Sequence, residues 1–214
     1  MATLVRAVRK HSTLCWLDLS RNECGLESCQ AITSLLVKST DEESSSTSCK
    51  LRGLTMNGCD IDDLGLLTIQ PALAEPQCTL QHLHLCDNRI TDDGLVEFLK
   101  ACSDQPSLCS LWLSGNDFGD RGASELLKVV QHNYQLEQVV LDSYLACFRE
   151  IQYFTLLNQG GRKLLQSDQH NVPLGLWPLV LERAQRIPVK LSTRQAGAAV
   201  DILYHLLQGP ALSK

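Results

Sequence analysis

The chain has 214 residues, of which 44% are hydrophobic and 20% charged, and its formal net charge at pH 7 is −5. This composition is ordinary for a globular protein of one domain, with or without an appendage. No stretch approaches the ~18 consecutive apolar residues of a membrane span, and the N-terminus lacks the features of a secretory signal. We therefore expect an intracellular protein that does not bind membranes, cytoplasmic or alternatively nuclear.

The charge is divided unevenly along the chain. Residues 1–143 carry 11 Lys and Arg against 20 Asp and Glu, whereas residues 144–214 carry 8 against 4. Because nucleic-acid phosphates require a basic surface, the acidic part is a poor candidate for nucleic-acid binding. We expect no nucleic-acid partner.

One spacing recurs from Leu14 onward: apolar residues at positions one, four, six and eleven, with Asn or Cys at position nine. This leucine-rich-repeat pattern builds one strand and one tight turn per copy. Further copies begin at Leu51, Leu80 and Leu108, and a partial fifth copy begins at Leu136. The strands are predicted near residues 15–19, 52–56, 81–85, 109–113 and 137–141.

The turn after each strand carries a side chain that can bond otherwise unpaired backbone groups. These turn positions are Asn22, Cys59, Asn88 and Asn116. Segments such as Thr91-Asp92-Asp93-Gly94 then provide helix-start residues with acids in the first turn. From Leu51 onward the copies begin 29, 28 and 28 residues apart, which leaves room for a helix in every repeat.

Over residues 4–143 these motifs resemble the ribonuclease-inhibitor-like subtype of the leucine-rich repeats, which also occurs in Ran GTPase-activating proteins and NOD-like receptors. The resemblance implies an α/β solenoid, a partial horseshoe with a parallel concave sheet and convex helices.

Two features interrupt the repeats. Residues 39–48 form an acidic, serine-rich insert, which we interpret as a mobile loop or, alternatively, as a phosphorylation site near Ser44–Ser46. The first strand, around Trp16, has no predicted neighbour on its N-terminal side. Either the chain continues upstream or a partner associates through this uncapped edge.

Residues 144–214 are predicted to form a small, mainly helical cap. Residues 150–157 are interpreted as a sixth, closing strand, with a helix as the alternative. Three short helices are expected after it, at Arg162–Gln166, Leu174–Gln185 and Thr193–Leu207. This tail resembles one that follows leucine-rich repeats in proteins of unicellular algae, a likeness that implies no activity.

Ten cysteines occur without any C-x-x-C pair, so reduced thiols are expected rather than a disulfide framework. His82, His84 and Cys86 alternate on one strand face and could in principle ligate zinc. Without a second ligand pair, we favour a variable repeat surface and expect neither metal nor cofactor.

No catalytic signature occurs, which favours a non-enzymatic module that binds an unidentified protein on its concave face. The expected partner-binding residues are Trp16, Asp18, Thr55, His82, His84, Trp112 and Asp142. One alternative is a GTPase-activating regulator of a small GTPase that uses the turn residues Asp60, Asp63, Asp117 and Asp120. Another is a ubiquitin-ligase substrate receptor that docks through residues 172–186.

Overall fold

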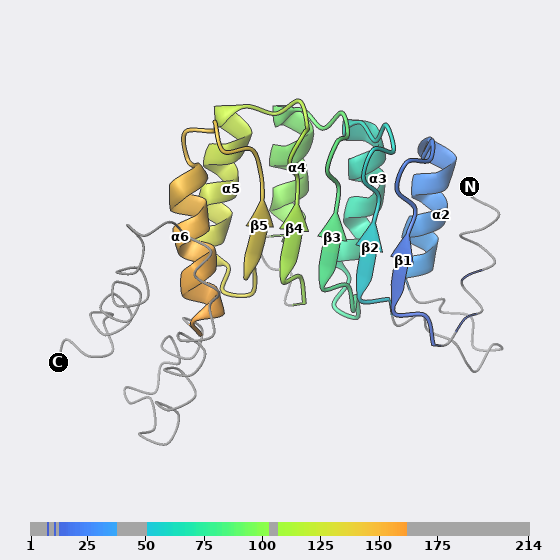
Figure 1. The fold of residues 1–214 in the computed structure, drawn as a ribbon. Helices are drawn as coiled ribbons and strands as arrows, with labels where there is room; N and C mark the ends of the chain where they lie inside the picture. Colours follow the sequence, from blue (N-terminus) through green and yellow to red (C-terminus); the bar gives the residue numbers. More distant parts are fainter. Residues whose placement is uncertain (1–7, 9–10, 12, 38–50, 103–106, 162–214) are drawn as a thin grey trace, which may run out of the picture.

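The computed structural model describes residues 8, 11, 13–37, 51–102 and 107–161 of the chain (Figure 1). The serine-rich insert at 39–48, the three helices expected after residue 161 and the docking segment 172–186 lie outside the described residues.

The described chain alternates short strands with helices, and the five strands form one parallel sheet in the order β1-β2-β3-β4-β5 (Figure 1). The strands are β1 Trp16–Asp18, β2 Gly53–Thr55, β3 His82–His84, β4 Ser110–Trp112 and β5 Gln138–Val140. The helices are α2 Leu26–Leu36, α3 Asp63–Ala74, α4 Asp92–Cys102, α5 Asp120–His132 and α6 Phe148–Gln159. The expected α/β repeat solenoid is confirmed. No helix in the described ranges is long and apolar enough to cross a membrane.

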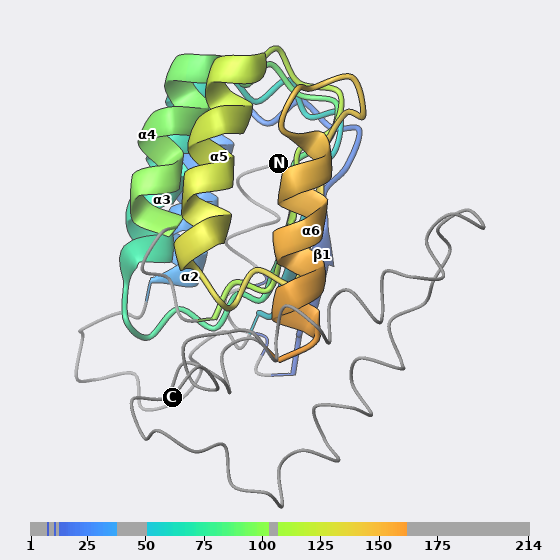
Figure 2. The same cartoon turned by 90° about the vertical axis from the view of Figure 1, so that its left-hand side faces the viewer.

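The sheet has an apolar face against α2–α5 and an opposite face, here called the concave face, that those helices leave open (Figure 2). The central residues of the strands align in register as Leu17, Leu54, Leu83, Leu111 and Val139. All except Leu17 are fully or almost fully buried. Because side chains alternate along a strand, the residues on either side of these five point to the concave face.

The turn asparagines join consecutive repeats through hydrogen bonds to the backbone. The Asn88 side-chain amide donates to the carbonyls of Met56 and Leu85, and its Oδ1 accepts from the amides of Cys59 and Ile61. Asn116 repeats the pattern one turn later. Each side chain thus satisfies buried backbone groups of two repeats.

Cys59 and Asn22 occupy the same turn position in the first two repeats. The Cys59 thiol donates to the Leu19 carbonyl across 3.2 Å, the bond that an asparagine amide makes in later repeats. The Asn22 amide donates to the carbonyls of Leu19 and Ser20 within its own repeat. A hydrogen bond with Cys24 lowers the pKa of the Cys59 thiol and raises that of Cys24. Free thiols among the described residues include Cys15, Cys24, Cys29, Cys59, Cys78, Cys86 and Cys147.

Acids at the helix starts connect each repeat to the next one. The Asp63 carboxylate accepts from the Thr91 amide and hydroxyl, and the Asp92 carboxylate accepts from the amides of Gly119 and Gly122. A Cβ at Gly94 would lie 2.0 Å from the Asp63 carboxylate. Because Gly94 has no side chain, the Asp63 carboxylate of the preceding repeat has room at the start of α4. Its negative charge interacts favourably with the positive N-terminal end of the helix dipole.

The predicted closing strand at 150–157 is wrong, because these residues belong to helix α6. Figure 2 shows α6 beside the strands rather than in the row of α2–α5. Ile151, Thr155 and Asn158 are buried and spaced as one face of a helix. The β-favouring residues of this run misled the sequence interpretation, since packing overrides such propensities.

Helix α6 covers the last edge of the sheet with side-chain amides. Gln152 donates to the Val139 carbonyl across 2.7 Å, and Gln159 donates to the Glu137 carbonyl across 2.6 Å. Asn158 donates to two further carbonyls in the preceding turn. Edge-strand groups that another strand would otherwise pair are thereby satisfied without a strand.

Candidate interaction surface

An aromatic strip, defined as Trp16, His82, His84 and Trp112, crosses the concave face from β1 to β4. The Trp16 ring lies 5.4 Å from the His82 ring and 5.6 Å from the His84 ring, measured between centroids. His84 stacks on Trp112 with a centroid separation of 4.0 Å and an interplanar angle of 14°. Strands far apart in sequence therefore contribute to one continuous surface.

Gly53 makes this continuity possible, and the sequence interpretation missed it. It pairs with Trp16 on β1 and with His82 on β3, in the middle of the strip. A Cβ built on Gly53 would lie 2.1 Å from the Trp16 ring. The indole thus lies across β2 in space that any other residue would fill. A glycine inside a strand signals such a close approach.

His84 is the buried member of the strip, and the adjacent Thr55 is also buried. Their exposed fractions are 9% and 7%, and Thr55 Oγ1 lies 3.4 Å from His84 Nδ1. Burial lowers the pKa of the His84 imidazole, neighbouring His82 lowers it further, and Asp18 partly opposes the shift. His84 is consequently a neutral support for the tryptophans at neutral pH.

The two tryptophans differ in their surroundings. Trp16 is 46% exposed although it is one of the largest apolar side chains of the chain. Trp112 is partly buried, and its indole Nε1 is buried without a hydrogen-bond partner among the described residues. An unpaired buried donor costs about 1–3 kcal/mol. Trp16 is therefore the more accessible of the two tryptophans.

Asp18 and Asp142 lie at opposite ends of the sheet. Asp18 is exposed, and hydrogen bonds from Ser20 hold the pKa of its carboxyl below the usual value. The Asp142 carboxylate accepts from the Ser114 hydroxyl across 2.6 Å and from the Gly115 amide across 2.9 Å. Asp142 therefore supports the turn after β4 and does not join the strip.

The acids of the turn edge are mostly engaged within the fold. Asp60 pairs with Arg89 across 3.0 Å, Asp63 holds the start of α4, and Asp120 accepts from the Ala146 amide. Among the four acids considered for a GTPase-contacting edge, three already have internal partners. Among the described residues, no group of three or more His, Cys, Asp or Glu is arranged to hold a metal, so His82, His84 and Cys86 do not form such a group.

A leucine-rich-repeat family model matches residues 77–99 and 105–127. Human NACHT, LRR and PYD domains-containing protein 5 is 35% identical over 82 residues, which cover 38% of this chain and 7% of that protein. Mouse ribonuclease inhibitor is 26% identical over 126 residues, which cover 58% of this chain and 28% of that protein. The chain thus spans a small part of the relatives' length.

Among solved structures, the actin-binding site 2 of leiomodin-1 is similar, with a TM-score of 0.58 and 16% identity. The alignment covers 79% of this chain and 95% of that chain. At this identity the likeness shows the fold alone. Together with the family match, it establishes leucine-rich repeats in a solenoid, an architecture that generally supports protein–protein interaction.

Proposed function

We propose that this chain is a non-enzymatic interaction module that binds a protein partner on its concave face, with the aromatic strip as the anchor. The observation that carries the proposal is the continuous Trp16–His84–Trp112 contact across the sheet. The repeats of β1, β3 and β4 supply this surface, and binding on it needs no catalytic pocket.

The exposure of Trp16 supports an interface at this place. An indole that is 46% exposed leaves apolar area in water, and covering that area on binding is favourable. Tryptophans are enriched among the few interface residues that dominate binding energy. Gly53 and the stacked histidine hold the rings in position, so little side-chain entropy remains to be lost when a partner binds.

The relatives are consistent with this mode. One relative is named a ribonuclease inhibitor, and the name of another gives leucine-rich repeats beside other domains. The GTPase and ligase alternatives receive no comparable support. Three of the four turn acids are engaged internally, and residues 172–186 lie outside the described chain.

Affinity purification with chemical cross-linking and mass spectrometry tests the proposal. The wild-type chain, Trp16→Ala and the control Leu64→Ala serve as baits, because Leu64 is an apolar residue that is 59% exposed at the start of α3, away from the strip. A partner that cross-links near β1–β4 should be lost with Trp16→Ala and kept with Leu64→Ala. Equal capture by all three baits contradicts the proposal.

A further inference from the structure

The outward positions of the five strands carry almost no charge. One row across the sheet is Trp16, Gly53, His82, Ser110 and Gln138, and the next row is Asp18, Thr55, His84, Trp112 and Val140. In the formal charge count at pH 7, Asp18 on the outermost strand is the only charge among these ten positions. The centre of the concave face is therefore electrically neutral.

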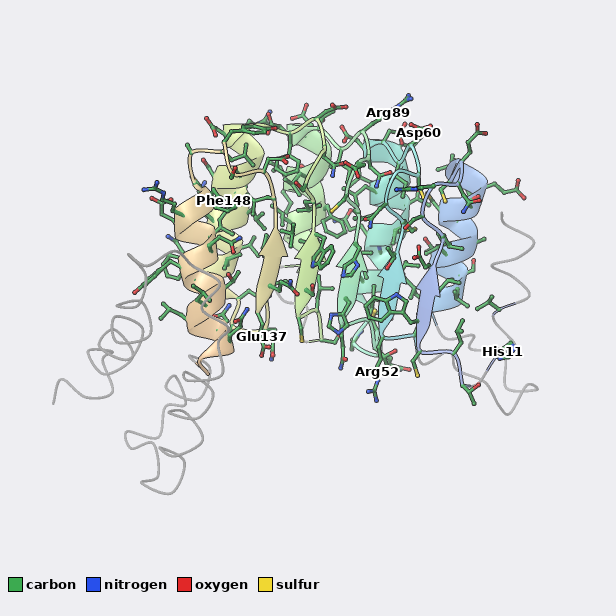
Figure 3. The ribbon with its side chains drawn as sticks, in the orientation of Figure 1. His11, Arg52, Asp60, Arg89, Glu137 and Phe148 are labelled. Carbon is green, nitrogen blue, oxygen red and sulfur yellow. The ribbon has the colours of Figure 1, made fainter. Side chains whose placement is uncertain are left out.

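This neutrality contrasts with the acidic composition of this part of the chain, since residues 1–143 carry 20 acidic and 11 basic side chains. The charged residues labelled in Figure 3 lie beyond the strand ends, with Arg52 and Glu137 at one end and Asp60 and Arg89 at the other. An interface whose aromatic centre lacks charge and whose periphery is polar is the arrangement found in desolvated protein contacts.

Apart from Asp18, the polar groups of the two rows are neutral donors and acceptors. The Ser110 hydroxyl donates to the Gln138 amide oxygen across 3.3 Å, and His82 lies beside Ser110 in the parallel register. An anionic group placed over Trp16 and Trp112 would lose hydration without gaining a positive charge at any of these ten positions. A cationic group would gain only the ring faces and Asp18 on the outermost strand, so a desolvated ion is poorly compensated there. An apolar side chain with neutral hydrogen-bonding neighbours meets no such penalty.

We propose that the partner presents an uncharged, apolar segment to the aromatic strip, flanked by neutral hydrogen-bonding groups for the exposed Gln138. This inference rests on the proposed function and adds the chemistry of the partner. Affinity should depend on apolar burial and little on ionic strength, because salt screens charge pairs and not apolar contact.

Three matched series of short synthetic peptides test the inference with the full chain. Each series shares Trp, Phe and Leu positions, and the intervening residues are Ser, Thr and Asn in the first, Lys and Arg in the second, and Asp and Glu in the third. Binding is measured by titration at low and high sodium chloride for the wild type, Trp16→Ala and the control Leu64→Ala.

We expect the neutral series to bind best, with an affinity that changes less than about twofold between the two salt concentrations. Trp16→Ala should weaken that binding by about tenfold or more, and Leu64→Ala should leave it unchanged. The contrary result is that the Lys/Arg or the Asp/Glu series binds best, with an affinity that depends on Trp16 and on salt. That result overturns the inference about the partner's chemistry and leaves the concave-face function in place. If no series depends on Trp16, both are overturned.

Discussion

The turn edge and the concave face of this solenoid both carry conspicuous residues, yet they use them differently. At the turn edge, Asp63 and Asp92 bond the following repeat, and Asp60 pairs with Arg89. On the concave face, Trp16 and the histidines contact one another and leave one side open. Side chains that resemble a charged site in the sequence are engaged in holding the repeats together, whereas the available surface is aromatic and neutral.

The largest loss of stability is expected from a substitution on the inward face of a strand. Leu111 is fully buried between the sheet and the helices. Its replacement by alanine should lower the free energy of unfolding by about 2–5 kcal/mol, because it removes apolar contact and leaves a cavity. Denaturant titration monitored by circular dichroism provides the measurement. A loss below ~1 kcal/mol would place Leu111 outside the core.

The turn edge can be tested with two acids from the same side of the molecule. Asp92→Ala removes the acceptor for the amides of Gly119 and Gly122 and should cost about 1–3 kcal/mol. Asp117→Ala is the matched control, since the Asp117 side chain is exposed and makes no hydrogen bond or ion pair among the described residues. Equal stability of the two variants would mean that the inter-repeat acids do not hold the fold.

A smaller effect is expected where α6 covers the last strand. Gln152→Ala removes the donor to the Val139 carbonyl and should cost about 1 kcal/mol. The exposed Gln30 on α2 provides the control, and Gln30→Ala should change stability by less than ~0.5 kcal/mol. Hydrogen exchange of the β5 amides, which should quicken in Gln152→Ala alone, locates the effect.

The smallest expected effect is the change in stability with pH. Because the pKa of His84 is lowered in the folded protein, the unfolded chain binds a proton first as the pH falls. His84 should therefore reduce stability progressively below about pH 6.5, its unfolded value, and contribute no slope above it. Denaturant midpoints of the wild type and His84→Gln between pH 7.5 and about 5 check this expectation. Parallel curves for the two proteins would contradict it.

The repeat spacing predicted the fold because only one strand register places all the repeat leucines in the core. A shift of one residue would move Leu83 and Leu111 from the core to the concave face. The strands indeed lie at the centres of the expected ranges, for example β3 at His82–His84 within 81–85. The paired Trp16 and His84 were also identified from alternation alone, since alternation fixes which face a side chain occupies.

Other features depend on tertiary contacts that alternation does not encode. Helix α6 was interpreted as a strand because its residues favour strands, while its packing against β5 decides its conformation. Gly53 looks like an ordinary strand interruption until Trp16 is placed over it. Asp142 was expected at the interface, but its bonds to Ser114 and Gly115 come from the neighbouring repeat 27–28 residues away.

The central claim is that the concave aromatic strip binds the partner and contributes little to the fold. Trp112 and Leu111 are sequence neighbours on opposite faces of β4, so they form a matched pair. The decisive measurement is partner capture and melting temperature on the same preparations of Trp112→Ala and Leu111→Ala. We predict that Trp112→Ala no longer captures the partner and has a melting temperature within a few degrees of the wild type. Leu111→Ala should have a much lower melting temperature. The reverse result would contradict the register and the surface together.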